Sequence, residues 1–253
     1  MKKILVRGPA LSRSGYGEQV RFLMRALKAY EERFDIYLIT VGWGATGWIY
    51  EDNEERRWLD SLIAKTVEYI NSGGQFDISV QVTIPNEWEQ LAPINIGYTA
   101  GIESTRVDVG WIAKANEMDK IIVISNHTKY GFDKTEYNDV HLPQPGNPNN
   151  KVDGFRCVKP IEVVNYAVRN IEPEEIDLQL EHDFNYLVVA QWSIRKNIEN
   201  TVKWFLKEFA YDEVGLVLKI NSQSNSPLDL PITEERLREP ISIILRDYPE
   251  HKC

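Results

Sequence analysis

Short apolar runs alternate along this chain with segments of helical periodicity, and that alternation constrains the fold more than any other feature. The pattern begins at once, with a predicted strand at residues 3–7, a helix at 17–31 and a second strand at 35–41. Apolar residues in this helix recur at spacings of three and four, which places them on one face: Val20, Leu23, Met24, Leu27 and Tyr30. Strands that alternate with helices form parallel sheets covered on both faces. The sequence therefore predicts an α/β fold.

The alternation continues through the rest of the chain with one interruption. We predict a charged helix at 53–71, a helix at 109–116, and further strands at 77–83, 95–99, 120–124 and 161–164. Residues 136–159 are instead crowded with proline, asparagine and glycine and show no periodicity. This composition predicts a long irregular loop.

A fresh strand–helix–strand series follows an acidic connector, so we predict two domains, at residues 1–170 and 171–253. The second contains strands at 186–191 and 214–220, a helix at 198–210 and a last helix at about 233–248. Two strands make too small a sheet to stand alone and leave an open edge. We therefore expect this chain to be a piece of a longer protein, or else a partner chain to complete the sheet.

The charge balance and the cysteine count narrow the class of protein. Among 253 residues, 38 are Asp or Glu and 29 are Lys or Arg, which gives a net charge of -9. An acidic chain does not coat nucleic acid, so no nucleic-acid partner is expected. Cys157 and Cys253 support neither a disulfide framework nor a zinc site, which favours the cytoplasm. No apolar stretch approaches the ~20 residues of a membrane-spanning helix, while peripheral membrane contact stays open.

Two turns at predicted helix starts are candidates for binding phosphate. The first, Gln191 to Asn200 (QWSIRKNIEN), brings Arg195 and Lys196 between a strand and a helix. Unpaired backbone N–H groups and the helix dipole favour an anion at such a place. A basic pair before a helix is nevertheless more often a solvated corner than a ligand site.

The second turn, Ser14-Gly15-Tyr16-Gly17, precedes the first helix. Glycines there let the backbone approach a ligand, although a turn that only packs the helix on the sheet is an equal alternative. The spacing departs from the G-x-G-x-x-G dinucleotide motif, and no acidic residue follows the second strand to hold a ribose. A G-x-x-x-x-G-K-[ST] segment, which would indicate ATP hydrolysis, is also absent from the sequence.

Taken in order, these segments resemble a known family. The stretches SRSGYGEQVR, NIGYTAGIESTRVDVGWIAKANEMDKIIVISNHTKYGF and VVNYAV followed by YLVVAQWSIRKNIENTVKWFLKEFA are similar to segments of GT-B glycosyltransferases of the glycogen-synthase-like family 4. The resemblance covers nearly the whole chain. It implies two Rossmann-like domains with parallel sheets flanked by helices, the second of them incomplete, and a ligand bound between the sheets at the carboxyl ends of their strands.

The resemblance also assigns roles to individual residues. Gly15 and Gly17, on either side of Tyr16, match the loop that faces the donor phosphates and the acceptor. Lys196 matches the lysine that neutralises the nucleotide diphosphate, while Arg195 stands in for an arginine that many relatives carry where this chain has Gln191. Glu103 falls near the position of an active-site polar residue in the first domain. The E-x7-E element that grips the donor sugar in the family has no counterpart before Cys253.

By this resemblance the chain is an enzyme that moves a sugar from a nucleotide-diphosphate donor to a glycan or other hydroxyl acceptor, with retention of configuration. A basic turn at a helix start stabilises a leaving diphosphate without a metal. The sequence contains no Asp-x-Asp tripeptide, so we expect neither a metal nor any cofactor besides the donor substrate. Two alternatives stay open: an NAD-dependent enzyme that modifies nucleotide sugars, and a non-catalytic α/β interaction module. The oligomeric state is not indicated.

Three further residues have two interpretations each. Trp43 and Trp48 lie in a glycine-containing segment, where they would either stack on a sugar ring or pack on the protein. His127 begins a predicted helix and is more often a surface residue there than a base.

Overall fold

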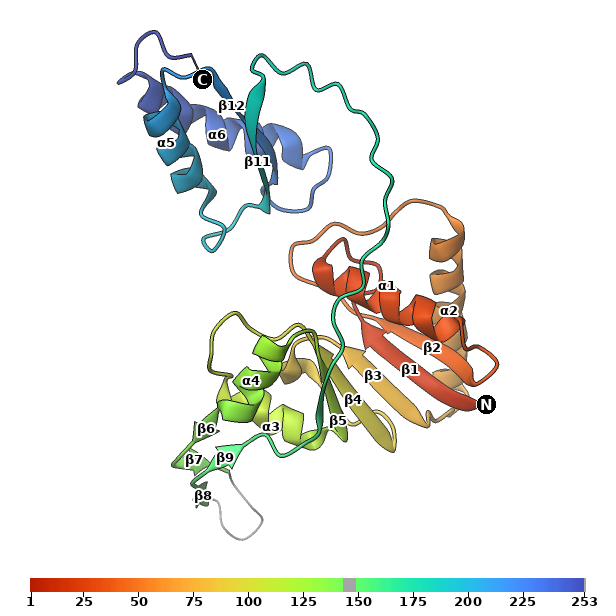
Figure 1. The fold of residues 1–253 in the computed structure, drawn as a ribbon. Coiled ribbons are helices and arrows are strands. Elements are labelled where there is room, and N and C mark those ends of the chain that lie inside the picture. Colours follow the sequence, from red (N-terminus) through yellow and green to blue (C-terminus); the bar gives the residue numbers. More distant parts are fainter. Residues whose placement is uncertain (143–148, 253) are drawn as a thin grey trace. The chain divides into compact units, whose positions relative to one another are not determined.

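The computed structural model describes residues 1–142 and 149–252. The chain divides into two compact units (Figure 1). Unit 1 comprises Met1–Trp43 and Trp48–Arg169, and unit 2 comprises Gly44–Gly47 and Asn170–Cys253. The main division thus follows Arg169, next to the predicted domain boundary. No helix in the described part of the chain is both long and apolar enough to cross a membrane.

Unit 1 contains a six-stranded, all-parallel sheet in the order β10-β5-β4-β3-β1-β2. Its strands are β1 (Lys2–Gly8), β2 (Phe34–Thr40), β3 (Ile78–Val82), β4 (Ile94–Thr99), β5 (Lys120–Val123) and β10 (Ile161–Val163). The chain passes from β1 outward to β2 and then returns to β3 on the other side of β1, so the strand order reverses between β1 and β3. The predicted α/β fold with a parallel sheet is confirmed.

Four helices cover this sheet: α1 (Gly15–Lys28), α2 (Glu54–Asn71), α3 (Val109–Glu117) and α4 (Asn126–Lys134). Successive residues of β5, and Ile124 directly after it, point to opposite faces, which identifies the layers. Ile122 and Ile124 pack into the core that contains residues of α1 and α2, whereas Ile121 and Val123 pack into the core of α3 and α4. Each fully buried aliphatic side chain contributes about 1.5–3 kcal/mol, so both faces of the sheet hold the unit together.

Each of these helices begins at a side-chain cap: Ser14, Asn53, Asp108 and Ser125. In α1 the cap places the start two residues earlier than predicted, because the Ser14 hydroxyl accepts a hydrogen bond from the Gly17 N–H at 3.0 Å. The helix also ends earlier, at Lys28. Tyr30, which we predicted on the apolar stripe, is 52% exposed in the turn that follows.

The prediction of an irregular loop at 136–159 is wrong for part of its described residues. Two antiparallel pairs of short strands form there: β6 (Glu136–Tyr137) with β9 (Phe155–Arg156), and β7 (Val140–His141) with β8 (Lys151–Val152). Tyr137 and Phe155 anchor the ribbon because they pack against the α3 and α4 core. Strands of two residues are too short to show alternation in the sequence, and residues 143–148 lie outside the described part.

A strap at residues 85–93, which begins with the short helix η1 (Pro85–Glu87), crosses the face of the sheet that α3 and α4 cover farther along. Its anchor is Trp88, which is fully buried. A Cβ atom on Gly97 of β4 would lie 2.6 Å from the indole ring, so glycine is required opposite this tryptophan. The amide of Asn95 closes the strap, since its Oδ1 accepts from the N–H groups of Leu91 and Ala92.

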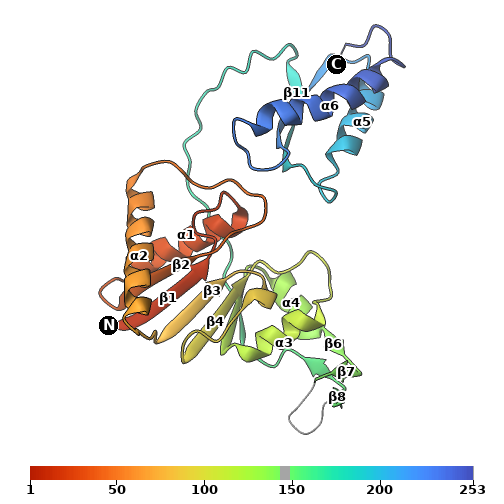
Figure 2. The same cartoon turned by 180° about the vertical axis from the view of Figure 1, so that it is seen from behind.

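Unit 2 consists of β11 (Phe184–Gln191), α5 (Ile198–Phe209), β12 (Val214–Asn221) and α6 (Asp229–Leu245), visible in Figure 2. The two strands pair in parallel, and both helices pack on one face of the pair around Ile198, Val202, Phe205 and Leu206. On the other face Leu187 and Val189 are 65% and 62% exposed. This is an α/β unit with two strands, and a second domain of GT-B type remains a prediction.

The last helix begins four residues before its predicted start. The buried carboxylate of Asp229 accepts from the N–H groups of Gln223 and Asn225, which fixes the preceding loop against the first turn of α6. Thr233, the predicted start, instead sits inside the helix and bonds the carbonyl of Asp229.

Candidate functional site

In parallel α/β sheets, ligands bind outside the carboxyl ends of the strands where the strand order reverses. In unit 1 that point lies between β1 and β3, and the turn leading into α1 follows β1 directly. Three predicted site residues, Gly15, Tyr16 and Gly17, therefore stand where the fold favours a ligand.

The two glycines of this turn have different surroundings. A Cβ atom on Gly17 would lie 2.1 Å from the Ser12 carbonyl oxygen, so the loop before α1 fits only against glycine. Gly15 is exposed, and no atom lies within 4 Å of its Cβ position. The structure thus gives Gly17 a packing role. Gly15 is the one with open space for a ligand, and ligand contact by either glycine remains a prediction.

Tyr16 points back over the sheet. Its hydroxyl lies 2.9 Å from Thr99 Oγ1 at the end of β4 and accepts a hydrogen bond from the Ala100 N–H at 3.1 Å. Its ring packs on Trp43, with 4.4 Å between the ring centroids. Burial raises the pKa of Tyr16, and the nearby charge of Glu87 acts in the same direction, whereas its hydrogen bonds oppose the rise. The phenol therefore stays neutral at pH 7.

The two tryptophans of the following segment also differ in their surroundings. Trp43 is half-buried against Tyr16, whereas Trp48 is 51% exposed and forms a backbone bridge with Ser12. Of the two, Trp43 is the one placed near the carboxyl ends of the strands.

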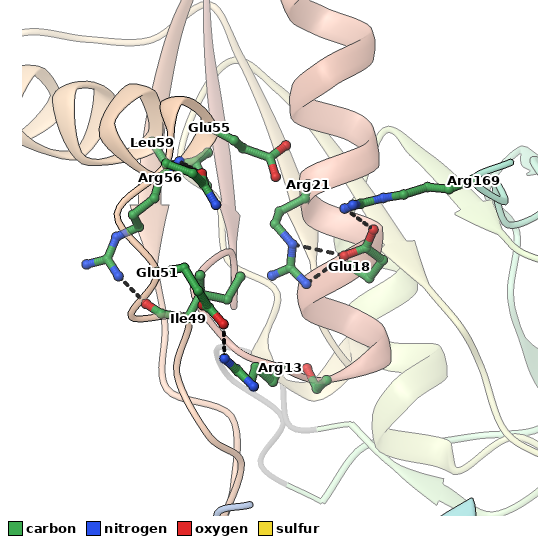
Figure 3. A pocket seen from close by; sticks show the side chains of 11 residues that line it. Arg13, Glu18, Arg21, Ile49, Glu51, Glu55, Arg56, Leu59 and Arg169 are labelled. Carbon is green, nitrogen blue, oxygen red and sulfur yellow. Dashed lines mark hydrogen bonds and ion pairs between the residues drawn. The ribbon is translucent and has the colours of Figure 1, made fainter. Parts of the chain in front are cut away.

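A pocket of about 450 Å³ opens beside the start of α1 (Figure 3). Four arginines and three glutamates dominate its lining, together with four other residues: Arg13, Arg21, Arg56, Arg169, Glu18, Glu51, Glu55, Ser14, Ile49, Asn53 and Leu59. The charges nearly cancel, so an anionic ligand entering this pocket has to compete with carboxylates.

Figure 3 shows how these charges are engaged. Arg21, whose side chain is 6% exposed, donates to the carbonyls of Ala10 and Ser12 at 2.7 and 2.9 Å and to Glu18 at 2.7 Å. Arg169 contacts the other oxygen of Glu18 at 2.7 Å. Burial acts to raise the pKa of Glu18, but Arg21 and Arg169 outweigh it, and the pKa is lowered. Arg21 is a structural clamp on the loop before α1.

Glu103, predicted as catalytic, lies on the loop between β4 and α3, and its side chain is exposed. The loop begins at Ala100 and Gly101, whose backbone lies next to Tyr16. His127, at the start of α4, is also exposed.

The predicted basic turn of unit 2 joins β11 to α5. The N–H groups of Lys196 and Asn197 both donate to the carbonyl of Ser193, at 3.1 and 3.0 Å. Asn197 adopts a left-handed conformation (φ 53°), and no side chain caps the helix. Arg195 and Lys196 are exposed, and within the described residues no carboxylate forms an ion pair with the Lys196 ammonium group. This helix start is open to an anion.

A pocket of about 310 Å³ adjoins the turn, lined by Trp192, Ser193, Ile194, Asn197, Ile198, Glu199 and Arg236. The guanidinium of Arg236, from α6, lies 4.1 Å from the Trp192 ring centroid and 3.6 Å from Glu199. Neither Trp192 nor Arg236 was predicted as a site residue. Their stacking joins distant parts of the chain, and no local motif signals it.

The structure brings Gly15, Tyr16 and Gly17 together in unit 1, and Arg195 and Lys196 together in unit 2. Glu103 belongs to unit 1, on a different loop. Among residues 1–142 and 149–252, no group of three or more His, Cys, Asp or Glu side chains is arranged to hold a metal ion.

Comparisons of the chain with models of protein families, with curated proteins and with solved structures found no match.

Proposed function

We propose that this chain belongs to a GT-B-type glycosyltransferase that moves a sugar from a nucleotide diphosphate to a hydroxyl acceptor. The observation that carries the proposal is the start of α5, which has no side-chain cap and follows a parallel strand with Arg195 and Lys196 exposed beside it.

A diphosphate suits this helix start for three reasons. The first-turn N–H groups of α5 have no partner within their own helix, and the helix dipole adds a partial positive charge. Lys196 adds a full charge on a flexible side chain, and charge-assisted hydrogen bonds to phosphate are about twice as strong as neutral ones. Arg236 stands at the adjoining pocket as a further cation, with Glu199 of the same pocket 3.6 Å away as its counter-charge.

Sugar transfer breaks the bond between the anomeric carbon and the diphosphate oxygen and forms a bond from that carbon to the acceptor oxygen. The leaving diphosphate gains negative charge as its bond breaks, so cations and N–H groups already in place lower the barrier. In this proposal Lys196 and Arg195 stabilise the diphosphate, no metal takes part, and the reaction retains configuration. Glu103 accepts the proton that the acceptor hydroxyl loses as the new bond forms.

Calorimetric titration of the chain with nucleotide diphosphates, in buffer containing a metal chelator, tests the proposal. We expect binding by at least one nucleotide, weakened about tenfold or more by Lys196→Ala, because a hydrogen bond to a charged group contributes about 1.5–3 kcal/mol. Lys203→Ala is the matched control: it removes the same charge from an exposed position farther along α5. Equal affinity in the two variants, or binding only with a divalent metal, contradicts the proposal.

A second candidate is supported by the open face of the β11–β12 pair. Leu187 and Val189 are mostly exposed there, which is expected if a partner chain covers that face and the unit serves as an interaction module. Light scattering coupled to size exclusion tests this candidate. A stable, monodisperse oligomer that binds no nucleotide favours the module over the enzyme.

A further inference from the structure

The side chain of Tyr16 connects two loops that belong to strands separated in the sheet. It contacts Trp43, which follows β2, and Thr99, which ends β4. The strand order places β1 and β3 between those two strands. Tyr16 therefore reaches across the carboxyl ends of β1 and β3, where ligands of parallel sheets bind.

The Tyr16 hydroxyl makes the kind of hydrogen bonds that an alcohol makes. Its oxygen accepts from the Ala100 N–H at 3.1 Å and shares a hydrogen bond with Thr99 Oγ1 at 2.9 Å. Thr99 Oγ1 in turn lies 3.2 Å from the Gly101 N–H, which donates to it. A sugar hydroxyl carries the same donor and acceptor capacity and can replace the phenol at both partners.

The surroundings favour a neutral oxygen over an anion at this place. Burial raises the pKa of Tyr16, and the charge of Glu87 raises it further, so the charged form of an oxygen here is disfavoured. A sugar hydroxyl is neutral, whereas a phosphate brings a charge that Glu87 opposes. A neutral hydroxyl therefore suits this place.

The backbone around Tyr16 is fixed, whereas its side chain is partly exposed. The Ser14 cap and the close packing at Gly17 hold the first turn of α1. The Trp43 side chain is also partly exposed, and glycine residues flank it at Gly42 and Gly44. Glycine gives the backbone freedom to adjust there, so the aromatic pair can separate without disturbing the helix.

We propose that Tyr16 is a displaceable plug, whose hydroxyl occupies the place of a sugar hydroxyl on Thr99 and the Ala100 N–H. When the sugar binds, it takes over both hydrogen bonds, and the rings of Tyr16 and Trp43 pack against its C–H face. The identification of the ligand as a sugar rests on the proposed transferase function, and the inference deepens that function by naming a position for the acceptor.

Nuclear magnetic resonance of the isotope-labelled chain tests the plug. The amide signal of Ala100 and the ring signals of Tyr16 are followed while methyl glucoside, methyl galactoside or glycerol is added, and inorganic phosphate is added in a separate titration. Tyr16→Phe removes the hydroxyl and keeps the ring. Thr99→Val removes the partner hydroxyl, and Tyr130→Phe, at an exposed tyrosine of α4, is the matched control.

We expect at least one of the three neutral compounds to shift the Ala100 and Tyr16 signals together in the unaltered chain. Tyr16→Phe should tighten that binding about three- to tenfold, because the ligand no longer competes with one neutral hydrogen bond. Thr99→Val should weaken it by a similar factor, and Tyr130→Phe should leave it unchanged.

Several results overturn the plug. One is that none of the three compounds shifts these signals in the unaltered chain, a test that needs no variant to fold. Others are a Tyr16→Phe variant that binds no tighter, and phosphate shifting Ala100 where the neutral compounds do not. The nucleotide titration at α5 is a separate measurement. If the chain binds sugars but no nucleotide, the plug is supported and the transferase proposal is contradicted.

Discussion

The starts of α1 and α5 follow the same plan, since each comes after the first strand of its unit, yet the structure builds them differently. The α1 start is closed: Ser14 caps it, Gly17 lets the preceding loop pack against it, and the buried Arg21 clamps that loop. The α5 start has no side-chain cap, and Lys196 beside it is exposed.

This difference shows that glycine and positive charge at a helix start carry different information. Gly17 is explained by a close approach of the protein's own backbone, which needs no ligand. The open start of α5 leaves N–H groups that its own helix does not use. We therefore assign diphosphate binding to α5 in our proposal, and we consider the α1 turn mainly a scaffold that holds Tyr16.

The largest expected effect comes from removing Arg21, which holds the loop before α1 in place. We expect Arg21→Ala to lower the free energy of unfolding by about 3–5 kcal/mol, because two carbonyl groups and the carboxylate of Glu18 lose a buried partner. Urea unfolding followed by circular dichroism measures the loss. Lys196→Ala, at the exposed α5 turn, should stay within about 0.5 kcal/mol. Similar losses in both variants would show that the two turns are equally structural.

The two glycines of the α1 turn allow packing and open space to be compared within one segment. Gly17→Ala should lower the free energy of unfolding by about 2–3 kcal/mol, since the new methyl group meets the Ser12 carbonyl oxygen at 2.1 Å. Gly15→Ala adds a methyl group in open space and should be neutral or stabilising by up to about 1 kcal/mol. The same unfolding measurement reports both. A Gly17→Ala variant as stable as Gly15→Ala contradicts the packing role.

How far the sequence predicts this molecule depends on whether a feature is local. The parallel sheet followed from the alternation of strands and helices, and the predicted helix at 53–71 begins at the residue that caps α2, Asn53. The strands at 136–137 and 155–156 escaped prediction because pairing with each other, rather than their own pattern, forms them. Arg236 on Trp192 was missed for the same reason.

At the candidate site, local patterns located the two turns but not what surrounds them. The packing at Gly17 depends on a loop carbonyl, and the position of Tyr16 depends on Thr99 and Trp43, none of which a glycine motif specifies. The β4–α3 loop was identified only by family resemblance, and the assignment of Glu103 stays a prediction. Chemistry that depends on contacts across the sheet requires the fold.

The caps offer a smaller contrast between the two helix starts. Ser14→Ala should lower the free energy of unfolding by about 1 kcal/mol, because the Gly17 N–H loses its acceptor. Asn197→Gly should change it by only a few tenths, since that side chain does not cap α5 and glycine tolerates its left-handed backbone. Thermal unfolding resolves the pair. A larger loss at Asn197 would mean that the α5 start is held by its own side chain.

The dependence of stability on pH gives the smallest expected effect. The pKa of Glu18 is lowered in the folded chain, through hydrogen bonds and charge from Arg21 and Arg169 that exceed the opposing effect of burial. A lowered pKa stabilises the folded state at pH values above the unfolded pKa, and this contribution disappears as the pH falls through the folded pKa. The carboxylate is about one-third exposed, so we expect its contribution to the free energy of unfolding to be less than about 1 kcal/mol.

Urea unfolding at neutral and at acidic pH measures this contribution. The Glu18→Gln variant should lose less stability on acidification than the unaltered chain. Glu199→Gln, at the exposed ion pair of unit 2, is the control and should follow the unaltered chain. If Glu18→Gln keeps the full acid dependence, the ion pairs beside α1 contribute no more to stability than the exposed pair beside α5.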